Sequence, residues 1–307
     1  MKYLDKFFEH LRFIHYAERT IESYYYNLKK LDNFLRGVKI TDEKEVTDKH
    51  IDDYIKHIRS LALSQRSYCR VLYDIKTYFT FLESQKIIFF SPVSHIDIPK
   101  EEKNPIKPID KDVLRELLDS INEETSTAIR IRTILELGYS SALRPREIIS
   151  IKIGDIDFSK KILFIRCSKN KKDRVVPVTE NALFWVKKYI DEVRVKFVTN
   201  TANNYLFIPH YPNCKTEHID YRCMFYCIRR YFQKHELKRF KLYALRSSSA
   251  THLLLNGMDI SHIKMYLGHE RLSTTQGYLR IETLDLKNIL DSKHPRNKFD
   301  EKQGGKK

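Results

Sequence analysis

Four prolines lie close together between positions 92 and 108, and they divide the chain of 307 residues into two parts. These residues are Pro92, Pro99, Pro105 and Pro108, with lysine and glutamate residues between them. Proline lacks a backbone N–H and disfavours a helix at the preceding residue, so such a segment is extended. The sequence therefore predicts a first domain at 1–90, a linker at 91–108, a second domain at 109–292 and a basic flexible tail at 293–307.

The first domain has four stretches in which apolar residues recur every three or four positions, as on one face of a helix. The stretches begin at Leu4, Thr20, Thr47 and Ser64, and the three hydroxyl residues can each cap a helix. Four amphipathic helices can close a small core. Three cations off the apolar stripe of the fourth stretch are candidate phosphate contacts, with a solvated helix face as the alternative: Arg66, Arg70 and Lys76.

The second domain combines helices with one β-hairpin. Asp110 can cap one helix, a second runs from Thr125 toward Tyr139, and Pro145 suits the first turn of a third. The remaining elements are two strands at 161–166 and 174–178 and two helices at 179–197 and 218–235. The predicted fold is therefore mainly α with a small β-hairpin in the second domain, an α+β class.

Two helix ends are expected in the stretch from 243 to 278. Asn256-Gly257 tolerates the left-handed backbone of a helix end, and Asp259 can cap the helix that follows. Gly268 is expected to end that helix and to present the next residue in a turn.

Three residues of this stretch, Arg246, His269 and Tyr278, are expected at element ends, where their side chains can converge. An arginine fork binds phosphate oxygens in a bidentate way, and a histidine can donate to another oxygen. A tyrosine hydroxyl can attack phosphorus once those charges are neutralised. The combination suggests phosphoryl transfer through a tyrosyl intermediate.

These residues resemble the C-terminal signature of the tyrosine recombinases, the phage integrase family. Tyr278 follows Leu267-Gly268-His269 with the family's spacing of nine residues, and Arg246 lies 23 residues before the histidine, as in the bacterial members. Residues 142–148, Ala-Leu-Arg-Pro-Arg-Glu-Ile, are similar to the family's Gly-Leu-Arg-x-x-Glu-Leu box. Residues 168–178 are similar to its Gly-Lys-Gly-x-Lys-x-Arg-x-Val-Pro hairpin.

The resemblance implies a division of catalytic labour. Tyr278 attacks the scissile phosphate, which leaves a 3′-phosphotyrosyl link and a free 5′-hydroxyl. Arg144 and Arg246 neutralise the nonbridging oxygens as bidentate forks, and Lys169 protonates the leaving oxygen. His269 donates to a nonbridging oxygen or assists the nucleophile. The covalent link keeps the bond energy, so no cofactor, metal ion or ATP is expected.

Two further residues of the site leave alternatives open. Tyr243 stands where the family usually has a histidine. It can donate its hydroxyl to the phosphate, only pack at a helix start, or act as a second nucleophile. Glu147 lies one helical turn after Arg144 and is expected to orient an arginine, with a plain surface glutamate as the alternative.

The implied function is site-specific recombination, meaning integration, excision or resolution of DNA by an integrase, transposase or Xer-type enzyme of mobile elements. The first domain resembles the family's SAM-like core-binding domain, so the two domains would clamp a DNA duplex. The implied partners are double-stranded DNA and three more copies in a homotetramer on two DNA sites. Accessory DNA-bending proteins are further candidates, and the expected location is cytoplasmic, at the nucleoid.

The charge of the chain points to the same partner. Lysine and arginine number 56 against 40 acidic residues, for a formal charge of +16, and such an excess favours nucleic acid. The alternative is a basic protein from a lysine-rich proteome. Further candidate DNA contacts lie in the basic hairpin and in the helix at 218–235: Lys171, Lys172, Arg174, Arg229 and Arg230. The sequence has neither a membrane-length apolar run nor a pattern typical of a signal peptide.

Five cysteines in a chain that is not expected to be exported predict reduced thiols. Some of them crowd with histidines at His210, Cys214, His218, Cys223 and Cys227. Their spacing lacks the paired Cys-x-x-Cys knuckles of structural zinc sites, so we expect no metal site and treat zinc as the alternative.

Two other function classes stay open. A DNA-binding protein that has lost catalysis is one, because Tyr243 departs from the family pattern, and a trapped covalent adduct separates it from the enzyme. A topoisomerase or hairpin telomere resolvase is the other, and a strand-exchange assay on two duplexes separates it. A metal-dependent nuclease is disfavoured, because no carboxylate cluster accompanies the Arg, His and Tyr set.

Overall fold

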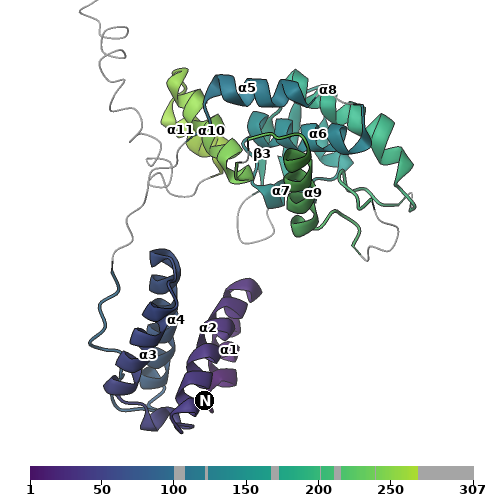
Figure 1. The fold of residues 1–307 in the computed structure, drawn as a ribbon. Helices are drawn as coiled ribbons and strands as arrows, with labels where there is room; N and C mark the ends of the chain where they lie inside the picture. Colours follow the sequence, from purple (N-terminus) through teal and green to yellow (C-terminus); the bar gives the residue numbers. More distant parts are fainter. Residues whose placement is uncertain are drawn as a thin grey trace, which may run out of the picture. The chain divides into compact units, whose positions relative to one another are not determined.

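A computed structural model describes residues 1–99, 108–121, 124–166, 173–200, 202–210, 216–238 and 240–268. The chain divides into two compact units, Met1–Lys103 and Asn104–Lys307 (Figure 1). Helices predominate in the described ranges, and a three-stranded antiparallel sheet lies in the second unit. The prediction of a mainly α fold with a small β element is therefore confirmed.

The first unit contains four helices: α1 (Leu4–Phe13), α2 (Glu18–Gly37), α3 (Asp48–Ser60) and α4 (Gln65–Ser84). Thr47 and Ser64 occupy the predicted cap positions of α3 and α4. The prediction that Thr20 caps the second helix is wrong, because it lies inside α2, whose cap position is Ala17. The Thr20 N–H donates to the Ala17 carbonyl at 2.7 Å, so the helix already includes the good helix formers before it.

Aromatic side chains from three helices meet in the core of the first unit. Phe7 of α1 contacts Tyr24 of α2 and Tyr78 of α4, with ring centroids 5.6 and 5.1 Å apart. Each such buried ring stabilises the unit by about 1.5–3 kcal/mol. Val93 and Ile96, which the predicted linker included, are also buried in this core.

A buried carboxylate ties together segments of this unit that are far apart in sequence. Glu43 lies in a 3₁₀ turn (η1, Glu43–Glu45) between α2 and α3 and is 1% exposed. Its oxygens accept the N–H groups of Lys2 and Tyr3 at 2.9 and 3.0 Å and the hydroxyl of Tyr78 at 2.6 Å. A buried carboxylate is tolerated only when donors satisfy it in this way.

The helices of the second unit are α5 (Lys111–Ser120), α6 (Ser126–Ser140), α7 (Pro145–Ser150), α8 (Glu180–Lys188), α9 (Tyr221–Lys234), α10 (Leu242–Leu255) and α11 (Ile260–Leu267). The side chains of Asp110, Thr125 and Asp259 accept backbone N–H groups at the starts of α5, α6 and α11, where these helices were predicted to begin. The predicted helix at 179–197 is α8, continued by a π turn (η3, Tyr189–Val193) and a 3₁₀ turn (η4, Arg194–Lys196). None of the helices in the described ranges combines the length and the apolar character needed to span a bilayer.

Helix α6 is the centre of the second unit. Every residue from 128 to 138 is buried, because α5, α7, α8, α9 and α10 all pack against this helix (Figure 1). Its buried Arg132 donates to the buried Glu136 at 2.8 Å, so these two charges are paired. The segment 141–144, which connects α6 to α7, therefore follows a helix that is packed on several sides.

The sheet consists of β1 (Ile156–Asp157), β2 (Ile162–Ile165) and β3 (Arg174–Pro177), and the 3₁₀ turn η2 (Ile153–Asp155) precedes it. Leu163 pairs with Val176 on the buried face, and Phe164 pairs with Val175 on the exposed face. The two predicted strands are confirmed. The sequence did not predict β1, because a strand of two residues has no detectable alternation.

The buried carboxylate of Glu43 generates a test of the first unit. Glu43→Ala should lower its free energy of unfolding by about 2–4 kcal/mol, because the Tyr78 hydroxyl and two N–H groups lose their acceptor. Hydrogen exchange of the α2 and α4 amides measures this unit alone. Glu45→Ala, an exposed change in the same turn, is the control, and equal exchange in the two variants would contradict the assignment.

Candidate active site

The centre of the site is the carboxylate of Glu147, the third residue of α7. Pro145 begins the helix, and Arg144 before it has the extended backbone expected ahead of a proline (φ −71°, ψ 144°). One oxygen of Glu147 (Oε2) accepts the N–H of Arg144 at 2.8 Å, which satisfies a donor at the helix start. The helix that presents this carboxylate therefore also fixes it.

Three guanidinium groups meet this carboxylate. Nη1 of Arg144 donates to Glu147 Oε1 at 2.7 Å. Arg174 of β3 donates with both terminal nitrogens, to Oε1 at 2.9 Å and to Oε2 at 2.8 Å. Nη1 of Arg246 from α10 lies 3.9 Å from Oε2. Three cations around one anion leave the cluster positive, which suits it to an anionic ligand.

Arg246 joins segments that are distant in sequence. Its side chain is fully buried, and Nη1 donates to the Ala142 carbonyl at 2.7 Å while Nη2 donates to the Leu267 carbonyl. Leu267 ends α11, where carbonyls have no donor from their own helix. Arg246 was expected at an element end, but it lies one turn inside α10. In this position its guanidinium reaches both carbonyls.

Burial and charge act on the site in opposite directions. Burial alone would raise the pKa of Glu147, but hydrogen bonds and charge from Arg174, with the backbone N–H and charge of Arg144, lower it to about 2. Burial and the charge of Arg144 lower the pKa of Arg246 to about 10, although Glu147 opposes this. Glu147 and Arg246 are therefore both charged near neutral pH.

Tyr243 is the second residue of α10, and it lies three residues before Arg246. It is 45% exposed, so part of the residue faces solvent. Five of the predicted site residues lie outside the described residues: Lys169, Lys171, Lys172, His269 and Tyr278. Among the described residues, the structure brings together Arg144, Glu147 and Arg246, with Arg174 as a fourth member.

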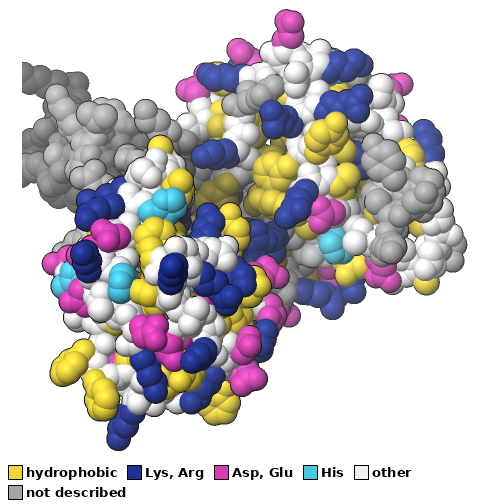
Figure 2. All heavy atoms as spheres, turned by 60° about the horizontal axis from the view of Figure 1, so that its bottom comes forward, with side chains coloured by type: hydrophobic (Ala, Val, Ile, Leu, Met, Phe, Trp, Pro, Cys, Tyr) yellow, Lys and Arg dark blue, Asp and Glu magenta, His cyan; other side chains and the backbone are white. Residues whose placement is uncertain are grey.

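The remaining candidate DNA contacts differ in their surroundings. Arg66, Arg229 and Arg230 are exposed. Arg70 forms an ion pair with Asp74, with Nε 2.9 Å from Oδ1, and Lys76 donates to a backbone carbonyl of its own unit at 3.0 Å. Figure 2 shows cationic side chains interleaved with acidic ones over the visible surface rather than gathered in one patch.

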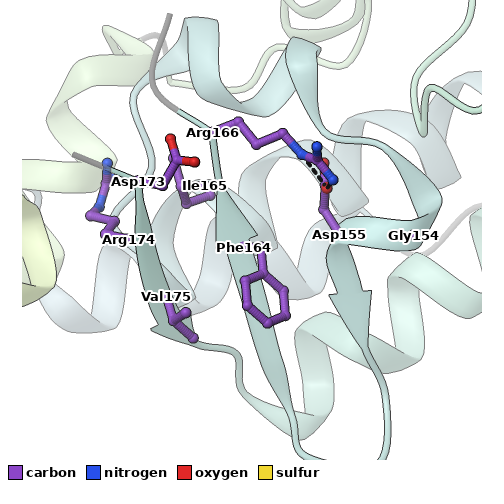
Figure 3. A pocket seen from close by; sticks show the side chains of 8 residues that line it. All are labelled: Gly154, Asp155, Phe164, Ile165, Arg166, Asp173, Arg174 and Val175. Atoms are coloured by element: carbon purple, nitrogen blue, oxygen red, sulfur yellow. Dashed lines mark hydrogen bonds and ion pairs between the residues drawn. The ribbon is translucent and has the colours of Figure 1, made fainter. Parts of the chain in front are cut away.

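An open pocket of about 400 Å³ lies at the ends of β2 and β3 (Figure 3). Arg166 donates across it to Asp155 at 2.7 Å, while Phe164 and Val175 lie on the exposed face of the sheet. The contact between Arg174 and Glu147 was not predicted from the sequence. Strand alternation indicates only that Arg174 shares a face with buried Val176 and not with exposed Val175, and it does not identify the partner.

The residues considered as an alternative zinc site are described only in part. No three His, Cys, Asp or Glu side chains are grouped to hold a metal ion among the described residues, and Cys214 lies outside them. His210 stacks on Phe197, with ring centroids 3.8 Å apart. Burial, together with the charge of Arg130, lowers the pKa of this histidine to about 3.

The family models and the relatives that match this chain all belong to one family. The model of the phage integrase family matches residues 107–284, and the model of the phage integrase N-terminal SAM-like domain matches residues 4–86. Tyrosine recombinase XerC of Pelotomaculum thermopropionicum is 31% identical over 219 residues, covering 70% of both chains. Tyrosine recombinase XerD of Oceanobacillus iheyensis is 32% identical over 216 residues, covering 69% of this chain and 70% of that protein. Tyrosine recombinase XerC 2 of Ralstonia nicotianae is 30% identical over 211 residues, and this match spans 59% of its length.

Solved structures show the same fold at lower identity. XerH recombinase bound to a palindromic difH substrate has a TM-score of 0.72 at 17% identity, covering 89% of this chain and 79% of that chain. A lambda integrase dimer bound to a COC′ core site has a TM-score of 0.68 at 15% identity, covering 90% and 93%.

The low pKa of Glu147 predicts how stability depends on pH. Its folded pKa of about 2 lies below the ordinary 4.5, so its contribution is full above about pH 4.5 and is lost as pH falls toward 2. Glu147→Gln should therefore cost about 3–5 kcal/mol of unfolding free energy at pH 7, because the guanidiniums lose their anion. The deficit should shrink below pH 4.5 in denaturation curves.

Glu116→Gln, an exposed change in α5, is the matched control and should cost little at any pH. A deficit for Glu147→Gln that stays constant from pH 7 to pH 3 would show that the charge of the carboxylate does not hold the cluster.

Proposed function

The chain belongs to the phage integrase family and is a tyrosine recombinase, an enzyme of site-specific DNA recombination; we propose that Tyr278 is its nucleophile and that Arg144 and Arg246, gathered at Glu147, balance the charge of the scissile phosphate. The observation that carries the proposal is the meeting of Arg144, Arg174 and Arg246 at one carboxylate. Such a positive cluster stabilises the extra negative charge of a phosphoryl-transfer transition state.

The proposed reaction has two symmetrical steps. The Tyr278 hydroxyl gives its proton to His269 or to solvent as its oxygen forms a bond to the scissile phosphorus, the bond to the 5′ oxygen breaks, and that oxygen takes a proton from Lys169. The product is a 3′-phosphotyrosyl link and a free 5′-hydroxyl. In the second step the 5′-hydroxyl of a partner strand returns a proton to Lys169 as it attacks the link, and Tyr278 leaves and takes up a proton, so the number of phosphodiester bonds is conserved.

We assign the two family arginines different positions in this reaction. Arg144 is 26% exposed and can donate to a nonbridging oxygen while Glu147 still holds it. Arg246 is buried and donates to the carbonyls of Ala142 and Leu267. From this position Arg246 contributes positive charge beside Glu147.

Tyr243 and His269 complete the proposed set. The hydroxyl of the half-exposed Tyr243 supplies a neutral hydrogen bond where the family usually has a histidine. It replaces the donor without replacing a cation, and the arginines supply the charge. His269 donates to a nonbridging oxygen or assists Tyr278.

The wider assembly follows from family membership and stays part of the proposal. The first unit would act as the core-binding domain and the second as the catalytic domain, with double-stranded DNA between them. Four copies would act on two DNA sites, with accessory DNA-bending proteins as further partners. Such an enzyme would work on DNA of the nucleoid.

The nucleophile is tested by one substitution. Tyr278→Phe should abolish covalent adducts with a nicked duplex that carries the target site, because only the attacking oxygen is lost, while DNA affinity is kept. Adducts are counted on denaturing gels. Adducts that persist would identify another nucleophile, and a wild-type protein that binds DNA without forming any would be a DNA-binding protein that has lost catalysis.

The departure at Tyr243 generates a second test. Tyr243→Phe should slow single-turnover cleavage by about ten- to a hundredfold, in the range of one lost transition-state donor or roughly 1.4–2.7 kcal/mol. DNA affinity should hardly change, and Tyr243→His should recover most of the rate. Cleavage at the parental rate would leave Tyr243 only a packing role.

A further inference from the structure

We propose that Arg174 is a positioning residue of the active site and not a DNA contact: it holds the C-terminal corner of α11 against Glu147. This corner is Leu267-Gly268, and the next residue in sequence is His269. The inference rests on the proposed function, because the corner affects catalysis only if His269 has the role proposed above.

The terminal nitrogens of Arg174 are committed to Glu147. They donate to its two oxygens at 2.9 and 2.8 Å, a parallel fork that fixes both the position and the plane of the guanidinium. The two side chains are 10% and 11% exposed, and Nε of Arg174 is buried. A phosphate contact needs donors that face solvent, so this arginine is poorly placed for one.

Gly268 lies directly on the Arg174 side chain. A Cβ at this glycine would be 2.7 Å from Cδ and 3.1 Å from Nε of Arg174, so the backbone approaches as closely as a glycine allows. Its φ of +62° is also in the left-handed region that favours glycine. Figure 3 shows Arg174 and Arg166 pointing away from each other on opposite sides of the hairpin.

A second arginine holds the same corner. Arg246 donates to the carbonyl of Leu267, and its guanidinium also lies beside Glu147. The corner is therefore fixed by hydrogen bonding at Leu267 and by packing at Gly268, with Glu147 as the common anchor. Because consecutive Cα atoms are about 3.8 Å apart, a shift of Gly268 moves the start of the next residue with it.

The conservative variant Arg174→Lys separates positioning from DNA contact. Lysine keeps the charge, so a phosphate contact would largely survive, but it has no planar fork to pack beneath Gly268. In single-turnover cleavage of a nicked target duplex, the rate of adduct formation should fall by about tenfold or more, as expected for misplaced groups. The DNA Kd should change by less than about threefold, and its salt slope should not change.

Arg166→Lys is the matched control. Arg166 also pairs with a buried carboxylate, Asp155, in the same hairpin, but its side chain is 69% exposed and points to the other side. This variant should leave the cleavage rate unchanged. A normal cleavage rate in Arg174→Lys would overturn the proposal, as would an increase in Kd with a flatter salt slope as the only defect.

A second measurement does not depend on activity. Amide exchange of residues 260–268 in the DNA-free protein should be faster by about tenfold in Arg174→Lys, because the last turn of α11 loses a restraint. Arg166→Lys should exchange like the wild type. Unchanged exchange in Arg174→Lys would overturn the proposal even if the wild type formed no adduct, an outcome that would separately contradict the proposed function.

Discussion

The carboxylate of Glu147 is the interaction on which the rest of the site depends. It accepts the backbone N–H of Arg144 at the start of α7, the side chain of the same arginine and a second arginine from β3, and it lies beside a third from α10. Guanidinium groups repel one another, so three of them gather only around an anion. The burial of this anion is tolerated because nearly every lone pair has a donor, and the surplus of positive charge remains for a phosphate.

Helix ends supply the other constraint. Helices α6 and α11 finish near the site, and the carbonyls of Ala142 after one and Leu267 at the other accept from Arg246. A buried arginine thereby uses acceptors that no helix donor can reach. The same contacts that satisfy the backbone also set the distance between α7, α10 and α11. The same interactions therefore stabilise the fold and position the catalytic groups. A substitution of Glu147 should affect both stability and catalysis.

Much of this arrangement was predictable from local sequence. Asp110, Thr125, Pro145, Asp259 and Gly268 each act within a few residues, and each marks a helix boundary as predicted. The features that the sequence did not predict lack a local signal. The start of α2 at Ala17 lacks a capping side chain, and the orientation of Arg246 depends on carbonyls 21 or more residues away. The partner of Arg174 is a glutamate 27 positions earlier, which no periodicity reveals.

The central claim is that this cluster neutralises the charge of the scissile phosphate, and a neutral substrate tests it most directly. Replacing that phosphate by a methylphosphonate removes the negative charge that Arg144 is proposed to balance. Single-turnover cleavage by the wild type and by Arg144→Ala is then compared on both substrates. The account predicts a large defect on the phosphate and a much smaller one on the methylphosphonate. An equal defect on both substrates would contradict it.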